Sequence, residues 1–199
     1  METTGQPLTP RFEEALVYAT RLHARQFRKG TAVPYVAHLL GVTSIALLFG
    51  ANEDEAIAAL LHDAVEDQGG AETREEIRRR FGENVAAIVD GCTDTDVVPK
   101  PPWRARKEAY ILHIRNASSS VRLVSSADKL DNARAVLGDY RVVGENLWAR
   151  FKGGKDGTLW YYSELVKAFR EAGGGLLVDE LDRVVKEIHR LAANGPLKA

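Results

Sequence analysis

The sequence has little that would suggest a secreted, membrane or nucleic-acid-binding protein. Its single cysteine, Cys92, cannot form an internal disulfide bond, so nothing indicates an oxidising compartment. Charge of one sign is not in excess either, because 27 Lys and Arg residues balance 28 Asp and Glu residues. No apolar run approaches the roughly 18 residues of a membrane span, and no basic segment followed by an apolar stretch opens the chain. We therefore expect a cytoplasmic protein with no nucleic-acid or membrane partner.

Strand patterns are also nearly absent, since period-two alternation of apolar and polar residues is hardly seen. Apolar residues recur instead at helical spacing. Helices are expected at about 11–28, 34–49, 53–68, 73–81, 83–92, 103–116, 120–138, 158–171 and 178–193. The pattern predicts an all-α protein, a single helical bundle of about eight to ten helices.

No linker justifies a division, so one domain is expected over residues 1–199. Residues 1–9 are expected to form a flexible lead, with Thr9 as the N-cap and Pro10 at the first helical position. Residues 139–157 contain the string GGKDG and are expected to form a long loop with one helical turn. Three glycines precede the expected terminal helix in 176–199.

The string LLHDAVED, beginning at Leu60, carries the densest cluster of reactive groups. The side chains that would share one face of a continuous helix are His62, Asp63, Glu66 and Asp67. Crowded carboxylates raise one another's pKa unless a cation lies among them, and a divalent metal would supply it. A lone His-Asp pair, however, is more often an exposed polar face.

Two further residues strengthen the metal interpretation. His38 lies on an expected helix among small and apolar neighbours, which predicts an inward-facing imidazole. Asp128 lies on a helix expected to be largely buried, and a buried aspartate needs a partner or a metal. With His62 and Asp63 they offer two nitrogens and two carboxylates. Such a set suits Mn²⁺, Fe or Zn²⁺ with positions left open for solvent.

The order of these residues resembles the metal-binding signature of the HD superfamily of phosphohydrolases. Four strings are moreover similar to the hydrolase domain of RelA/SpoT enzymes and small alarmone hydrolases: HARQFRKG from His23, PYVAH from Pro34, HDAVED from His62 and ADKLDN from Ala127. The resemblance covers roughly residues 11–170 and leaves 171–199 unexplained. It implies an HD helical bundle, one Mn²⁺ ion and removal of the 3′-pyrophosphate of the nucleotide (p)ppGpp, leaving GDP or GTP.

The resemblance also implies a role for each matching residue. The metal ligands would be His38, His62, Asp63 and Asp128. The pair that activates or orients the attacking water would be Glu66 and Asp67. The residues that contact the nucleotide would be Arg28, Lys29, Lys107, Asn132 and Tyr162.

Two departures from the family pattern bear on the substrate. Leu39 stands where the family usually has proline, and the segment between Gly138 and Gly157 is longer than in compact members. One alternative is an HD nucleotidase or phosphatase that acts on (p)ppApp, NADPH or a deoxynucleotide. Another is an HD domain that binds a nucleotide without turnover. A homo-oligomer is also left open.

Overall fold

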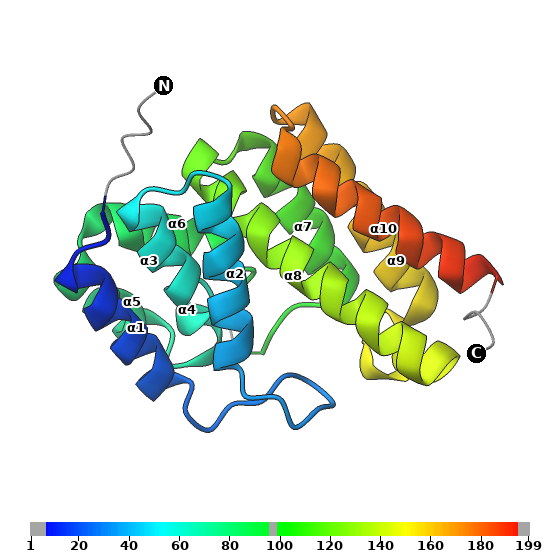
Figure 1. Cartoon of the computed structure of the whole chain (residues 1–199), viewed down its shortest axis with the longest axis horizontal. Coiled ribbons are helices and arrows are strands. Elements are labelled where there is room, and N and C mark those ends of the chain that lie inside the picture. Colours follow the sequence, from blue (N-terminus) through cyan, green and yellow to red (C-terminus); the bar gives the residue numbers. More distant parts are fainter. Residues whose placement is uncertain (1–6, 96–98, 195–199) are drawn as a thin grey trace. The chain divides into compact units, whose positions relative to one another are not determined.

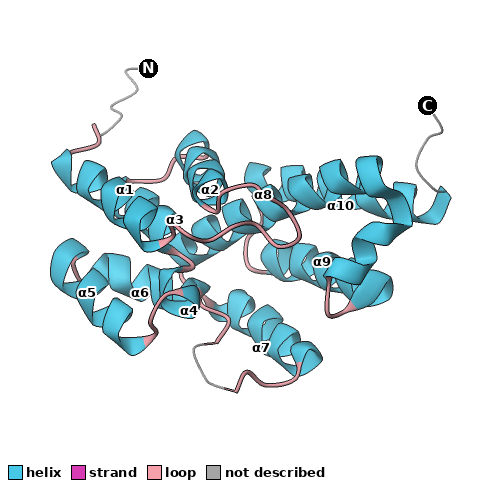
Figure 2. Ribbon diagram, turned by 90° about the horizontal axis from the view of Figure 1, so that it is seen from below, coloured by secondary structure: helices cyan, strands magenta, loops and turns pink. Residues whose placement is uncertain are grey.

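The structure, a computed structural model, describes residues 7–95 and 99–194. These residues form ten α-helices and one 3-10 helix, and Figure 2 shows no strand among them. The expected all-α class and helix number are therefore confirmed. None of the helices in the described ranges is long and apolar enough to cross a membrane.

Contacts within the chain divide it into two compact units. Unit 1 comprises Met1–Asp96 and Ser119–Val124, and unit 2 comprises Val97–Ser118 and Ser125–Ala199. Helix α8 (Ser119–Val143) starts in unit 1 and continues into unit 2. The single domain expected over 1–199 stays a prediction.

Unit 1 is built around one central helix. Its helices, labelled in Figure 1, are α1 (Pro10–Leu22), α2 (Val36–Leu48), α3 (Glu53–Leu61), α4 (Ala64–Asp67), α5 (Ala71–Phe81) and α6 (Glu83–Cys92). Helix α3 packs against α1, α2 and α6, and all six residues from Ala56 to Leu61 are fully excluded from solvent. Burial of each leucine stabilises the fold by about 1.5–3 kcal/mol. The most buried helix of unit 1 thus ends directly before His62.

Local capping explains where α1 and α3 begin. Thr9 accepts a hydrogen bond from the Arg11 backbone N–H at 3.2 Å, and Pro10 takes the first position of α1, as expected. Asn52 and Glu55 form a capping box at the start of α3. These reciprocal bonds satisfy backbone donors that a helix start leaves unpaired.

Helix α1 ends earlier than expected, at Leu22 instead of about Arg28. His23 is the C-cap, and residues 23–35 form a loop. Backbone groups in this loop form hydrogen bonds with one another. The Arg28 N–H, for example, donates to the Val33 carbonyl at 2.9 Å. This bond ties the two sides of the loop together as the chain returns to α2.

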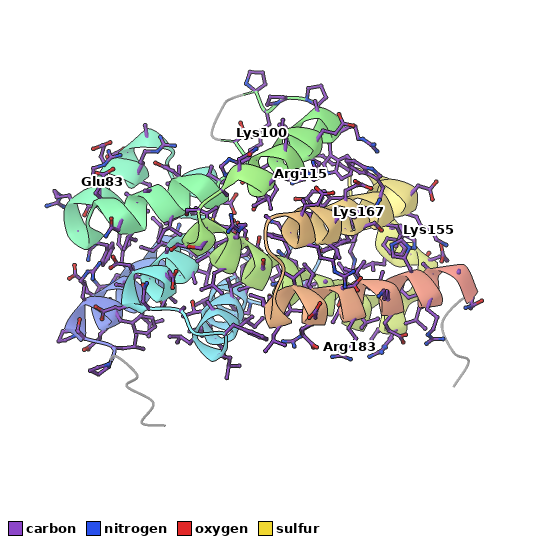
Figure 3. The ribbon with its side chains drawn as sticks, turned by 90° about the horizontal axis from the view of Figure 1, so that it is seen from above. Glu83, Lys100, Arg115, Lys155, Lys167 and Arg183 are labelled. Carbon is purple, nitrogen blue, oxygen red and sulfur yellow. The ribbon has the colours of Figure 1, made fainter. Side chains whose placement is uncertain are left out.

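Unit 2 has α9 at its centre. Its helices are α7 (Trp103–Asn116), the remainder of α8, the 3-10 helix η1 (Gly144–Arg150), α9 (Gly154–Glu171) and α10 (Leu176–Asn194). Helix α9 contacts α7, η1 and α10, and Figure 1 shows α10 running beside it. Lys167 and Arg183, labelled in Figure 3, are exposed on these two helices, whereas Leu181 and Ile188 of α10 are buried.

Helical structure replaces most of the long loop expected at 139–157, and the helical turn expected within it is present as η1. Helix α8 continues to Val143, η1 follows it directly, and α9 already begins at Gly154. Two apolar side chains hold η1 in place, since Leu147 is 1% and Trp148 5% exposed. Lys155 adds a hydrogen bond from its Nζ to Glu145 Oε1 at 2.9 Å. The glycines in this segment had suggested a loop, but burial of the apolar residues between them favours regular structure.

The expectations for the two ends of the chain can be compared with the structure only in part. Residues 1–6 of the expected flexible lead lie outside the described residues, and residues 7–9 carry no helix. The terminal helix is present as α10, from Leu176 to Asn194. Residues 195–199 lie outside the described part.

Candidate active site

A break between two helices positions His62 and Asp63. Sequence periodicity predicted one continuous helix here, but α3 ends at Leu61 and α4 starts at Ala64. Asp63 takes φ −99° and ψ −1° as the N-cap of α4. The Nδ1 atom of His62 lies 2.9 Å from the Ala59 carbonyl oxygen. Because a carbonyl only accepts, Nδ1 carries the hydrogen and Nε2 keeps a lone pair for another partner.

The nitrogen atoms of two buried histidines converge on one carboxylate oxygen. His62 Nε2 lies 3.0 Å and His38 Nε2 3.7 Å from Asp63 Oδ2. Each histidine is only 2% exposed. Two N or O ligands of one metal ion, each about 2.1 Å from it, lie about 3.0–3.4 Å apart. The His62–Asp63 distance falls within this range and the His38–Asp63 distance lies slightly beyond it. The donor types of these three side chains, two imidazoles and one carboxylate, fit a divalent metal.

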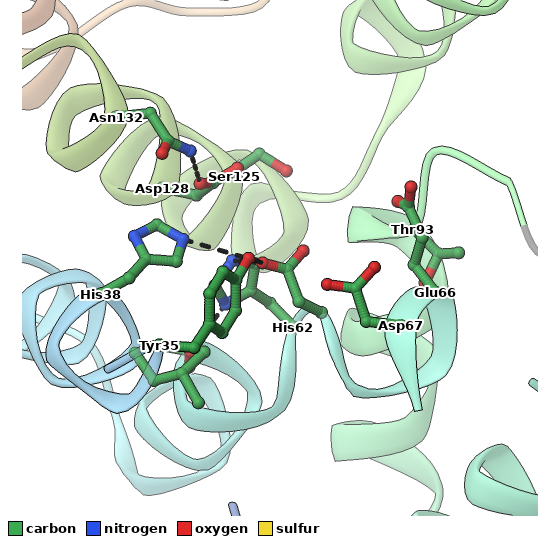
Figure 4. A network of polar contacts seen from close by, with 12 residues as sticks. Tyr35, His38, His62, Glu66, Asp67, Thr93, Ser125, Asp128 and Asn132 are labelled. Atoms are coloured by element: carbon green, nitrogen blue, oxygen red, sulfur yellow. Dashed lines mark hydrogen bonds and ion pairs between the residues drawn. The ribbon is translucent and has the colours of Figure 1, made fainter. Parts of the chain in front are cut away.

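Tyr35 packs over the same side chains. Its hydroxyl donates a hydrogen bond to Asp63 Oδ2, and its ring meets the His38 ring edge-on with centroids 5.4 Å apart (Figure 4). On its other side the Tyr35 ring stacks on His23 at 5.3 Å. Burial lowers the pKa of His23, although the Gln26 hydrogen bond and the charge of Asp63 oppose the shift. At neutral pH the imidazole that stacks on Tyr35 is therefore uncharged.

The two expected catalytic carboxylates both lie on α4, one turn beyond Asp63 (Figure 4). Glu66 is half-buried, and its Oε2 accepts from the Asp94 backbone N–H at 3.3 Å. Asp67 is exposed, and its Oδ2 accepts from the Gln26 side-chain amide at 2.8 Å. Both are positioned within unit 1 by partners distant in the sequence.

In unit 2, Asp128 is 6% exposed and accepts two side-chain hydrogen bonds. Lys129 Nζ donates to its Oδ2 at 2.5 Å, and the Asn132 amide donates to its Oδ1 (Figure 4). Burial disfavours the Lys129 ammonium, but Asp128 together with Tyr110 and Tyr161 offsets this and holds the pKa of Lys129 well above its usual value. The pair requires an ionised carboxylate at Asp128, and a metal ligand requires the same state.

The residues expected to contact a nucleotide are distributed over both units. In unit 1, the half-buried Arg28 and the exposed Lys29 lie on the loop between α1 and α2. In unit 2, Lys107 Nζ lies 4.9 Å from the Tyr161 ring centroid. Tyr162 on α9 is 8% exposed. Their nucleotide contacts, like that of Asn132, stay predictions.

Sequence reasoning assigned no role to Gln26, Tyr35 or Lys129. Each stands within one of the strings that carry the family resemblance, which is the one signal that could have found them. Their own chemistry gives no such signal, because an amide, a phenol or a lysine does not indicate a metal site. The structure identifies them through their hydrogen bonds to Asp67, Asp63 and Asp128, respectively.

Comparisons with known proteins show what this chain is similar to. A family model described as "HD domain" matches residues 15–159. The guanosine-3′,5′-bis(diphosphate) 3′-pyrophosphohydrolase MESH1 of Xenopus tropicalis is 41% identical over 124 residues, which cover 61% of this chain and 66% of that protein. The pyrophosphohydrolase of Aquifex aeolicus is 34% identical over 62% of this chain, but the match covers only 17% of its own length. The chain thus spans less than two thirds of both relatives.

Two solved structures extend the likeness to the fold. One, described as a metazoan ortholog of SpoT that hydrolyses ppGpp, superposes with a TM-score of 0.76 at 26% identity. That match covers 94% of this chain and 99% of the other. A protein of Listeria monocytogenes EGD-e superposes with a TM-score of 0.68 at 32% identity, over 77% of this chain and 99% of the other.

Proposed function

The chain belongs to the HD domain family, and we propose on this basis that it hydrolyses the 3′-pyrophosphate of (p)ppGpp. The products are pyrophosphate and GDP or GTP. The observation that carries the proposal is the convergence of His38 Nε2 and His62 Nε2 on Asp63 Oδ2, one helical turn before the Glu66–Asp67 pair. The names of the relatives, which act on this nucleotide, support the choice of substrate.

The proposed metal ligands are His38, His62, Asp63 and Asp128. His38, His62 and Asp128 are each buried, and imidazole and carboxylate groups of this kind hold divalent metals. Mn²⁺ is the proposed ion because the resemblance to the alarmone hydrolases implies it, and the mixed nitrogen and carboxylate set suits Mn²⁺ as well as Fe or Zn²⁺.

The bound ion would supply Lewis-acid polarisation of the phosphoryl group and help to activate water. Glu66 or Asp67 accepts a proton from the attacking water as its oxygen bonds to the phosphorus attached to the ribose 3′ oxygen. The bond between that phosphorus and the 3′ oxygen breaks, and the 3′ oxygen takes up a proton. The nucleotide keeps a 3′ hydroxyl, and pyrophosphate leaves.

Cationic and polar side chains bind the substrate in this proposal. A pyrophosphate carries several negative charges, more than one divalent ion neutralises, so further cations are needed. Arg28 can stack on a purine or pair with a phosphate, whereas Lys29 and Lys107 meet phosphates as point charges. Tyr162 contacts the ribose side of the nucleotide, and Asn132 is a further substrate-binding residue.

Metal analysis combined with a nucleotide panel tests the proposal. The purified chain is analysed for bound metal, loaded with Mn²⁺ and incubated with ppGpp, pppGpp, ppApp, NADPH, deoxynucleotides and 5′-monophosphates. We expect about one divalent ion per chain and release of pyrophosphate from ppGpp in one step, with GDP as the other product.

Other outcomes of the same panel assign the alternatives. If ppGpp stays intact while a 5′-monophosphate is cleaved to a nucleoside, the chain is an HD nucleotidase. If a nucleotide binds but none is hydrolysed, the chain is a binding domain. Either result overturns the alarmone proposal.

The cytoplasm is part of the proposal, because a single cysteine and a nucleotide substrate suit that compartment. Whether copies of the chain associate is tested by light scattering of the same sample.

A further inference from the structure

The loop between α1 and α2 contains a short antiparallel pairing that joins Gln26 to Tyr35. Phe27 and Pro34 form an isolated bridge, and the Tyr35 N–H donates to the Gln26 carbonyl at 2.9 Å. The chain reverses at Gly30, whose φ of 74° favours glycine. Gln26 and Tyr35 are therefore held side by side. Arg28 follows Gln26 on the way to the turn at Gly30.

The Gln26 side chain is fixed by three partners. Its Nε2 donates to Asp67 Oδ2 at 2.8 Å. Its Oε1 lies 2.6 Å from Gln68 Nε2 and 2.6 Å from His23 Nδ1, and accepts from both. Because a carboxylate only accepts, the amide nitrogen must face Asp67. The two donors on Oε1 prevent the amide from turning over, so the contact with Asp67 has one orientation.

Tyr35 is fixed in a similar way on the other side of the same loop. Its ring is confined between His23, at 5.3 Å, and His38, at 5.4 Å. The hydroxyl that remains donates to Asp63 Oδ2. One hydrogen bond from each side of the loop thus reaches a different carboxylate of unit 1.

We propose that Gln26 and Tyr35 are positioning residues for Asp67 and Asp63. Gln26 fixes the orientation of the Asp67 carboxylate through Oδ2. Tyr35 sets the rotation of the Asp63 carboxylate toward the metal. The proposal rests on the proposed function, in which Asp63 is a ligand and Asp67 handles the proton. It also joins substrate binding to catalysis, because the same pairing carries Arg28.

The Gln26 contact is tested with Gln26→Leu and the isosteric Gln26→Glu. The glutamate keeps an acceptor for His23 and Gln68 but loses the donor to Asp67. We expect both variants to lower kcat about 10- to 100-fold, the usual effect of losing such a supporting contact, with KM changed less than about twofold. The melting temperature and metal content should stay those of the wild type. Wild-type kcat in Gln26→Glu would show a purely structural role and overturn the proposal.

Coupling to Asp67 is measured with a double-mutant cycle. In an Asp67→Asn background, Gln26→Leu should have little further effect on kcat, because its partner is already changed. Equal fold-losses in both backgrounds contradict the proposal. Phe27→Ala serves as the matched control, since Phe27 lies in the same pairing with its side chain 56% exposed and should keep wild-type kcat.

The Tyr35 contact is tested without turnover. Tyr35→Phe removes only the hydroxyl and keeps the ring, so Mn²⁺ affinity in a direct titration should fall about 10- to 100-fold. Unchanged affinity overturns this half of the proposal. Failure of the proposed function is seen separately, as a wild-type protein that binds Mn²⁺ but leaves ppGpp intact.

Discussion

Gly91 of α6 lies so close to Val121 of α8 that a Cβ atom at position 91 would stand 2.4 Å from Val121 Cγ2. Both residues belong to unit 1, where α8 begins. The contact sets how the first turns of α8 pack, and the same helix carries Asp128 about two turns further on. Glycine is required here by close approach and not by backbone conformation.

Gly91→Ala should therefore destabilise the protein. Overpacking of a tight contact costs about 1–3 kcal/mol in the free energy of unfolding, which urea denaturation measures. The matched control is Gly138→Ala, because Gly138 is an exposed residue of α8 with nothing within 4 Å of a Cβ atom. That variant should instead gain about 0.5–1 kcal/mol. Equal stability of Gly91→Ala and the wild type contradicts the close packing.

Asp63→Ala should abolish metal binding and hydrolysis together. The variant removes the carboxylate on which both histidine nitrogens converge, so Mn²⁺ loses a charged ligand. Metal content and the rate of pyrophosphate release are measured on the same sample. Asp156→Ala, at an exposed aspartate of α9, is the control and should behave as the wild type. Stoichiometric metal with normal activity in Asp63→Ala excludes this ligand assignment.

Glu66→Gln separates proton transfer from metal binding. The amide keeps the size of the side chain and an acceptor for the Asp94 N–H, but it cannot take a proton. We expect the metal to stay and kcat to fall about 10²- to 10⁴-fold. Loss of metal in parallel with the rate would make Glu66 a ligand and move the catalytic role elsewhere.

Arg28→Ala should act mainly on substrate binding. Its contact with the nucleotide would be shared by the ground and transition states, so KM should rise with little change in kcat. Loss of a charge-assisted hydrogen bond corresponds to about 10- to 100-fold in KM. Arg25→Ala, at an exposed arginine of the same loop, is the matched control. A fall in kcat at unchanged KM is the contrary result.

Acid should weaken unit 2 through Glu180. Hydrogen bonds from Arg183 at 2.6 Å and Arg134 at 3.0 Å lower the pKa of this carboxyl from 4.5 to about 2, against an opposing effect of burial. Because the folded-state pKa is the lower one, the stabilisation is present above about pH 4.5 and is lost toward pH 2. Between about pH 4.5 and pH 2, the free energy of unfolding measured with urea should fall less steeply in Glu180→Gln than in the wild type. Identical pH slopes in the two proteins would exclude the contribution.

Local sequence was sufficient to predict much of the fold. Helix α7 runs over the expected 103–116, and Asn52 caps α3 as expected, because spacing and capping act within a few residues. The predictions of secondary structure failed where contacts outside the local sequence pattern determine the conformation of the backbone. Apolar spacing favoured a helix through residues 23–28, yet His23 caps α1 and the loop backbone pairs with itself. Glycines favoured a loop with a single helical turn in 139–157, yet α8 continues to Val143 and α9 already begins at Gly154.

The sequence alone determined the residue types of the candidate site and their order, because a metal site needs imidazoles and carboxylates whatever surrounds them. Only the tertiary structure decided how those groups are oriented. Tyr35 reaches Asp63 across 28 residues and Gln26 reaches Asp67 across 41. Such contacts depend on how helices and loops pack, and helical periodicity, which relates residues three or four apart, carries no information about them.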